Sequence, residues 1–249
     1  MIRRAALALA AWLAASSAGA VECNNVSYDG NRYAICEVDA SEEQLQLFLR
    51  NDDGQVIGHF STLEKLLAQQ GKTLPFATNA GMYHSSRAPV GLYVEDGAEE
   101  MRLVTNAGPG NFGLLPNGVF CIREDRADVI ETLTFQKAAP DCRHASQSGP
   151  MLVIDGELHP RFLPDSDSRY IRNGVGTSAD GRRVVFAISR NAVSFHQFGS
   201  LFRDHLQLPN ALYFDGNISR LHAPQLDRSD AGFMMGPIVG VVEKTETSD

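Results

Sequence analysis

Short apolar runs separated by turn-forming residues dominate this chain. Residues 33–38 form one such run, and residues 45–50 form another in which leucines alternate with polar residues. This pattern, with a polar turn between the two runs, predicts a β-hairpin. Further short strands are predicted over residues 75–78, 90–94, 119–122, 129–135, 151–154 and 184–188.

Two segments have the features of helices. Ser61, followed by a glutamate three residues later, predicts the N-cap of a helix over residues 62–70, which Gly71 ends. A second helix is predicted over residues 195–206, where large apolar side chains recur at helical spacing, and a strand over 211–214 follows. These elements favour a single α+β domain with a mixed or antiparallel sheet core, about two main helices and many loops.

The first residues have the pattern of an export signal. Arg3 and Arg4 precede the apolar run 5–15, and small residues follow. We therefore expect a cleaved signal peptide over residues 1–20 and one domain over 21–249. Because no later apolar stretch reaches about 20 residues, we expect no stable membrane insertion and a periplasmic or secreted protein. The polar residues 243–249 are expected to fray.

Charge and cysteine content narrow the possible partners. The net charge is −8 and basic residues form no block, which argues against nucleic acid. Export would place the four cysteines where disulfides persist, and pairs close in sequence are favoured among the three possible connectivities: Cys23 with Cys36 and Cys121 with Cys142.

No cysteine or histidine spacing indicates a metal site. No cofactor is expected either, because the segment after Arg172 lacks the glycine order and the lysine of nucleotide-binding loops. A calcium ion held by loop carboxylates stays an open alternative, and the sequence gives no oligomeric state.

Polar residues and glycines follow several predicted strands, where loops on a rigid scaffold tend to hold function. These segments cover residues 78–84, 147–150, 171–176 and 213–217. An aspartate that ends a strand can act as a nucleophile or an electrostatic stabiliser, and an arginine can hold an anion through its planar donors. The alternatives at these positions are a turn-forming aspartate and a structural salt bridge.

The motifs NAGMYH, GNFGLLPNGVFCI, QSGPMLVIDGELHP, RNGVGTSADG and NALYFDGNISRL occur in this order. This series resembles the bacterial branch of the phosphodiester glycosidase family over residues 34–241. The family also includes the lysosomal enzyme that removes N-acetylglucosamine from a phosphodiester on mannose. The resemblance implies an exported hydrolase that releases a sugar from a sugar-1-phosphodiester, either a small molecule or an envelope glycan. The alternative is a non-catalytic protein that binds envelope glycans in the same pocket.

The resemblance also assigns roles to residues. The catalytic residues that it implies are Asp215, Arg172 and Asn79, and His84 is added as a candidate acid or base because a histidine follows the Asn79 turn. For substrate binding the resemblance implies Gly81 and Gly216, Gln147 is a candidate because an amide can both donate to and accept from sugar hydroxyls, and Asn173 and Gly174 follow Arg172 in the same polar segment. Asp215 would act as nucleophile or electrostatic stabiliser, Arg172 would hold the phosphate and His84 would supply an acid or base. Where the lysosomal enzyme has a glycine-rich segment, this chain has residues 215–219, so the resemblance does not extend to the substrate preference of that enzyme.

Overall fold

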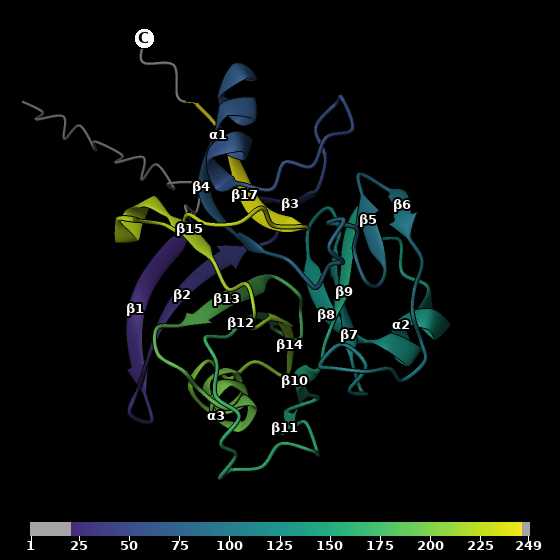
Figure 1. Ribbon diagram of the computed structural model, residues 1–249, viewed down its shortest axis with the longest axis vertical. Coiled ribbons are helices and arrows are strands. Elements are labelled where there is room, and N and C mark those ends of the chain that lie inside the picture. Colours follow the sequence, from purple (N-terminus) through teal and green to yellow (C-terminus); the bar gives the residue numbers. More distant parts are fainter. Residues whose placement is uncertain (1–20, 246–249) are drawn as a thin grey trace, which may run out of the picture.

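The computed structural model describes residues 21–245 (Figure 1). Its strands form three sheets in which every pairing is antiparallel, and three α-helices lie among the described residues. The α+β class predicted from the sequence is confirmed. The predicted signal peptide, residues 1–20, lies outside the described residues.

The largest sheet has seven strands. In spatial order they are β1 (Glu22–Tyr28), β2 (Asn31–Asp39), β13 (Arg183–Ser189), β12 (Asn173–Thr177), β14 (Asn210–Asp215), β10 (Met151–Ile154) and β11 (Glu157–Leu158). The register of β12 on β14 places Asn173 opposite Asp215. Since Arg172 immediately precedes β12, the two charged site candidates come from neighbouring strands.

Two five-stranded sheets complete the fold. The β4 sheet contains β16 (Arg228–Ser229), β15 (Leu221–Ala223), β4 (Lys72–Asn79), β17 (Ile238–Lys244) and β3 (Gln44–Phe48). The β7 sheet contains β6 (Ala98–Met101), β5 (Tyr93–Glu95), β9 (His144–Ser148), β7 (Gly118–Ile122) and β8 (Ala127–Glu131).

One aromatic cluster joins the three sheets. Phe186 of β13 contacts Phe76 of β4 and Phe120 of β7, with ring centroids 4.8 and 5.8 Å apart. Phe120 also contacts Phe214 of β14 at 6.2 Å. Burial of one such ring contributes about 1.5–3 kcal/mol, and edge-to-face pairs add to that. The sheets therefore share one core and form one folding unit.

Helix α1 (Phe60–Gln69) covers the β4 sheet at the top of Figure 1. Its apolar stripe, Phe60, Leu63 and Leu67, is buried. The expectation that Ser61 caps the helix is wrong, because the helix begins before it with His59 as the N-cap and without a side-chain cap. The stop at Gly71, whose φ is +67°, agrees with the prediction.

The other helices flank the remaining sheets. Helix α3 (Phe195–Ser200) continues into a π-helical turn, η1 (Leu201–His205), and this segment confirms the helix predicted over residues 195–206. It packs on the seven-stranded sheet at the bottom of Figure 1. Helix α2 (Thr132–Ala138) lies against β7 and β8, and a short 3-10 helix, η2 (Pro224–Leu226), follows β15.

Three predicted features differ from the structure. Strands β2 and β3 do not form a hairpin, because β2 pairs with β1 and β13 whereas β3 pairs with β17 in another sheet. Residues 129–135 are not one strand: the Glu131 carboxylate accepts the backbone N–H of Thr134 at 2.8 Å and starts α2. The expected fraying from residue 243 is wrong for Glu243 and Lys244, which pair with β4.

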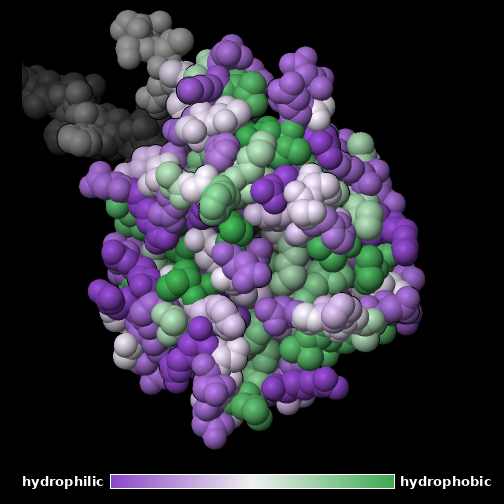
Figure 2. Space-filling model, viewed as in Figure 1, coloured by the Kyte–Doolittle hydropathy of each residue, from purple (hydrophilic) through white to green (hydrophobic). Residues whose placement is uncertain are grey.

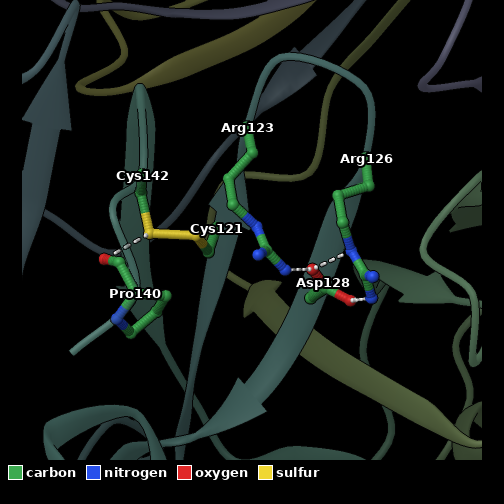
Figure 3. Close-up of a disulfide and its surroundings, with 6 residues drawn as sticks. All are labelled: Cys121, Arg123, Arg126, Asp128, Pro140 and Cys142. Atoms are coloured by element: carbon green, nitrogen blue, oxygen red, sulfur yellow. Dashed lines mark hydrogen bonds and ion pairs between the residues drawn. A yellow bond between two sulfur atoms is a disulfide. The ribbon is translucent and has the colours of Figure 1, made fainter. Parts of the chain in front are cut away.

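The predicted disulfide pairs are both present. Cys23 and Cys36 lie directly opposite each other on β1 and β2, and Cys121 of β7 joins Cys142. Beside the second disulfide, Asp128 of β8 pairs with Arg123 and Arg126 (Figure 3). Burial alone would raise the pKa of Asp128, but the hydrogen bonds from Arg126 and Arg123 lower it below its ordinary value.

Hydrophobic surface on the face shown in Figure 2 is divided into small areas among hydrophilic side chains. In the part of the chain that the structure describes, no helix has the length and apolar character needed to cross a membrane.

Candidate active site

A cavity of about 500 Å³ opens beside the end of β14. It is lined by Met82, Tyr83, Val90, Pro109, Gly110, Asn111, Phe112, Ser168, Tyr170, Arg172, Tyr213, Asp215, Gly216 and Asn217. Three of the predicted site residues, Arg172, Asp215 and Gly216, are therefore in one cavity. The tyrosines and asparagines of this lining were not among the predicted residues.

Asp215 is a half-buried carboxylate at the end of β14. Its Oδ1 accepts the backbone N–H of Asn217 at 2.9 Å, so Asp215 forms a turn as well as lining the cavity. Burial raises the pKa of Asp215 above its ordinary value, although backbone N–H groups of Asn217, Gly216 and Ile218 act in the opposite direction. The carboxylate is thus poorly solvated, which strengthens its interaction with a nearby positive charge.

Arg172 is a buried cation, with 1% of its surface exposed. Its Nε donates to the carbonyl of Val193 at 2.9 Å and its Nη2 to the carbonyl of Ser168 at 3.0 Å. The remaining nitrogen, Nη1, has no hydrogen-bond partner. Among residues 21–245, no carboxylate forms an ion pair with this guanidinium, so the salt-bridge alternative does not describe its environment.

Aromatic rings take the place of a counter-ion. The guanidinium carbon of Arg172 lies 3.6 Å from the ring centroid of Phe195, the first residue of α3. It also lies 5.4 Å from the rings of Tyr170 and Tyr213. The electron-rich faces of these rings attract a cation, but they do not neutralise it. Burial lowers the pKa of Arg172, and a positive charge remains beside the cavity.

Tyr213 also lines the cavity and was not among the predicted site residues. It is fully buried, and its hydroxyl has no hydrogen-bond partner. Strand alternation could have identified Tyr213 as a site residue. It lies two residues before Asp215 on β14, and residues at this spacing share one face of a strand. Burial raises the pKa of its hydroxyl, so the group stays protonated.

Asn79 and Asn173 form a pair of amides outside the cavity lining. Asn173 Nδ2 donates to Asn79 Oδ1 at 3.0 Å, and Asn79 Nδ2 donates to Asn173 Oδ1 at 3.2 Å. Asn173 Oδ1 also accepts the backbone N–H of Asp215 at 3.2 Å. Both amides are buried and engaged within the protein, so in this structure they hold the backbone around Asp215 in place.

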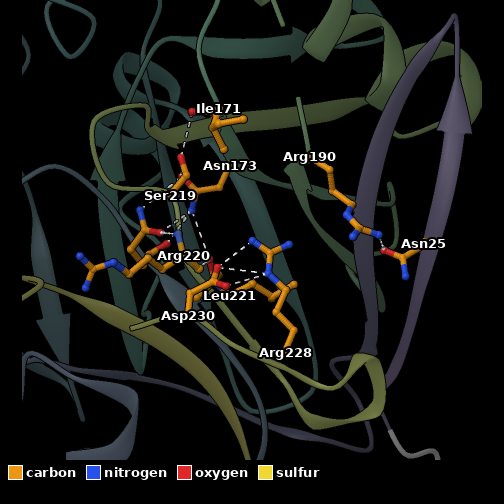
Figure 4. A network of polar contacts seen from close by, with 11 residues as sticks. Asn25, Ile171, Asn173, Arg190, Ser219, Arg220, Leu221, Arg228 and Asp230 are labelled. Carbon is orange, nitrogen blue, oxygen red and sulfur yellow. Dashed lines mark hydrogen bonds and ion pairs between the residues drawn. The ribbon is translucent and has the colours of Figure 1, made fainter. Parts of the chain in front are cut away.

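The same network reaches the loop after Asp215. Asn79 Nδ2 donates to the carbonyl of Ile218 at 2.6 Å, and Asn79 Oδ1 accepts the backbone N–H of Arg220 at 3.0 Å. Ser219, Arg220 and Asn173 lie together in Figure 4. The loop that follows the carboxylate is therefore tied to both β4 and β12.

Four other predicted residues lie away from the cavity lining. His84 is exposed, and Gln147 ties two loops together by accepting the backbone N–H groups of Leu92 and Val104 at 3.1 and 3.0 Å. A Cβ at Gly81 would lie 2.8 Å from the Ser146 hydroxyl, and one at Gly174 would lie 2.4 Å from a backbone carbonyl. Both glycines thus permit close packing, and direct substrate contacts of these four residues stay predictions.

No group of three or more histidine, cysteine, aspartate or glutamate side chains suited to a metal ion occurs within residues 21–245. The polar chemistry of the cavity rests on Arg172, Asp215, tyrosine hydroxyls and asparagine amides.

Comparison with known proteins places this chain in a family. A family model described as phosphodiester glycosidase matches residues 72–223, which include both Arg172 and Asp215. The chain belongs to this family. This chain is also 34% identical over 185 residues to the uncharacterized protein YigE of Escherichia coli, an alignment that spans 74% of this chain and 72% of YigE.

Solved structures share the fold. The catalytic domain of zebrafish N-acetylglucosamine-1-phosphodiester alpha-N-acetylglucosaminidase, auto-inhibited by its pro-peptide, matches with a TM-score of 0.61 at 13% identity, covering 89% of this chain and 82% of that one. A hypothetical protein from Synechocystis matches with a TM-score of 0.59 at 13% identity, covering 89% and 61%. At such identities the likeness establishes the fold alone.

Proposed function

We propose that this protein is an exported hydrolase that cleaves a sugar from a sugar-1-phosphodiester. The observation that carries the proposal is that Asp215 and Arg172 line one cavity without pairing with each other. An anionic and a cationic group held in this way offer complementary places for a sugar carbon and a phosphate.

Asp215 would act on the sugar. When the bond between the anomeric carbon and the phosphate oxygen breaks, positive charge develops on the sugar ring. The poorly solvated carboxylate of Asp215 can stabilise that charge or attack the carbon directly. Water finally supplies the hydroxyl on the anomeric carbon, and the bridging oxygen leaves with the phosphate.

Arg172 would act on the leaving group. The phosphate gains negative charge as the bond breaks, and the cation of Arg172 lies buried beside the cavity where water screens it little. Its unpartnered Nη1 can donate to a phosphate oxygen. Because a phosphate leaves more readily than an alcohol, the reaction depends less on a general acid, and one essential carboxylate suffices in this proposal.

Two observations support export. The disulfides Cys23–Cys36 and Cys121–Cys142 fit an oxidising compartment. A fold neighbour from Burkholderia pseudomallei, with a TM-score of 0.54 at 12% identity over 85% of this chain and 74% of that chain, is described as an exported protein. We place the enzyme in the periplasm or outside the cell.

The test is to incubate protein starting at residue 21 with a panel of sugar-1-phosphodiesters and measure released reducing sugar. We expect Asp215→Asn to lower kcat by at least about 100-fold, because it removes a charge aimed at the transition state. The matched control is Asp155→Asn, which changes an exposed turn aspartate outside the cavity lining. Undiminished hydrolysis by Asp215→Asn would remove Asp215 from the reaction, and binding without release of sugar would favour the glycan-binding alternative.

A further inference from the structure

Two hydrogen-bond donors at the cavity have no acceptor. They are Nη1 of Arg172 and the hydroxyl of Tyr213, and both residues line the cavity. The Arg172 side chain lies close to the Tyr213 hydroxyl: burial raises the pKa of that hydroxyl, and the charge of Arg172 and a hydrogen-bond contact with it act in the opposite direction. Neither Nη1 nor the hydroxyl has a partner in good hydrogen-bond geometry. A buried polar group without a partner opposes folding, because it has lost its hydrogen bonds to water. Two such donors side by side indicate a place that an anionic ligand completes.

The chain around Tyr213 is shaped to hold its hydroxyl there. A Cβ at Gly216 would lie 2.0 Å from the Tyr213 hydroxyl oxygen, so only glycine leaves room for that atom. Phe195 contacts the Tyr213 ring edge-on, with centroids 4.8 Å apart, and the same Phe195 ring stacks on Arg172. One aromatic side chain therefore fixes both donors relative to each other.

We propose that the Tyr213 hydroxyl is the second donor of the phosphate subsite and completes, with Nη1 of Arg172, a site for a singly charged phosphodiester. This inference rests on the proposed function. It identifies a substrate-binding residue that the family resemblance did not include.

The charges of the cavity explain the preference for one negative charge. Arg172 and Asp215 are the charged residues of the lining. A diester monoanion is balanced by Arg172, whereas the second charge of a phosphomonoester at pH 8 meets the carboxylate of Asp215 without compensation. The Tyr213 hydroxyl adds a donor without adding charge, and it stays protonated because burial raises its pKa.

The binding test uses dimethyl phosphate, a diester monoanion, and methyl phosphate, largely a dianion at pH 8. We expect calorimetry to show tighter binding of dimethyl phosphate to the wild type. In Tyr213→Phe the affinity for dimethyl phosphate should fall about tenfold, the effect of losing one hydrogen bond to a charged group. Equal affinity of wild type and Tyr213→Phe, or a wild-type preference for methyl phosphate, would overturn the proposal.

The chain offers a matched control. Tyr33 of β2 is also fully buried, its hydroxyl also has no partner, and it lies outside the cavity lining. Tyr33→Phe should leave dimethyl phosphate binding unchanged, which separates a local effect from a general effect of removing a buried hydroxyl. Gly216→Ala is a second variant: it retains the hydroxyl but displaces it, and it should weaken binding as Tyr213→Phe does.

Hydrolysis assays on the same variants separate the two proposals. If the wild type binds dimethyl phosphate through Tyr213 but releases no sugar from any sugar-1-phosphodiester, the proposed function fails and the phosphate subsite stands. If the wild type releases sugar while Tyr213→Phe matches it in binding and in kcat/KM, the role of Tyr213 fails and the proposed function stands.

Discussion

Arg172 has an environment that a purely structural arginine seldom has. Two of its nitrogens bind backbone carbonyls, a third has no partner, and its charge meets aromatic rings in place of a carboxylate. Burying a charge without a counter-ion opposes folding. The fold tolerates this cost at the wall of a cavity, where an anion can supply the missing interaction.

The raised pKa of Asp215 predicts an effect on the stability of the protein. Its folded-state pKa is raised by burial, so its favourable contribution to folding is present when it is protonated and is lost as the pH rises through that pKa. We therefore expect Asp215→Asn to raise the Tm at pH 7, since asparagine is neutral and can still accept the N–H of Asn217.

The measurement is thermal unfolding of wild type and Asp215→Asn across the acid range. The two Tm values should converge as the pH falls below the pKa of Asp215. A variant less stable than the wild type at pH 7 would contradict this account.

Site residues could be predicted from the sequence where a motif contains a residue type with an obvious chemical role, such as a charged side chain. The motif resemblance selected Arg172, Asp215 and Gly216, which the cavity brings together. Tyr213 was missed because a tyrosine inside an apolar strand is expected in a core, and its unpartnered hydroxyl is visible only once the neighbours are placed. The engagement of Asn79 within the protein likewise depends on strand pairing far along the chain.

At the scale of elements, the start of α3 positions the site. Ser194 accepts the backbone N–H of Gln197 at 3.2 Å, and the Gln197 side chain accepts the backbone N–H of Ser194 at 3.1 Å. This reciprocal cap fixes Phe195, the ring that packs on Arg172. The geometry of the cation therefore depends on how a helix begins.

Removing this cap should be measurable. We expect Ser194→Ala to lower the free energy of unfolding by about 1 kcal/mol. Urea denaturation measures the change, and Ser61→Ala is the control, because Ser61 is exposed in α1 and does not cap it. Equal losses of stability in the two variants would show that the Ser194 cap does not stabilise α3.

Ser61 and Ser194 also show what sequence patterns determine about elements. Helical periodicity placed both helices within a few residues, because it reflects the buried stripe of each helix. The capping pattern at Ser61 was misleading because the helix starts at the buried Phe60, two residues before the predicted start at residue 62. Strand alternation identified β2 and β3 but not their partners, since both strands bury one face and many partners satisfy that pattern.

At the scale of the whole molecule, acidic groups gather where two sheets meet. Glu43 lies between β2 and β3, and its Oε2 accepts the backbone N–H of Asp39 at 2.7 Å while its Oε1 is buried without a partner. Burial, with the nearby carboxylates of Glu243, Asp39 and Glu22, raises the pKa of Glu43 to about 7. The ionisation of one side chain therefore affects strands of both sheets.

This feature predicts a stability that depends on pH. The folded pKa of about 7 exceeds the ordinary value of 4.5, so the contribution of Glu43 is fully present below pH 4.5 and is lost as the pH rises through 7. Between pH 5 and pH 8 we expect the Tm of the wild type to fall relative to that of Glu43→Gln. Differential scanning calorimetry tests this, with the exposed neighbour variant Glu42→Gln as control; parallel curves for wild type and Glu43→Gln would refute it.

Among the strands of residues 21–245, β17 is the last in sequence, yet it lies between β4 and β3 and places Ile238 opposite Asn79. A nascent chain that has not yet produced residue 238 leaves both neighbouring strands with open edges, which are prone to pair with other chains. Insertion of β17 therefore closes the β4 sheet and removes both open edges, so a chain that lacks residues 238–244 should be more prone to self-association than the full chain.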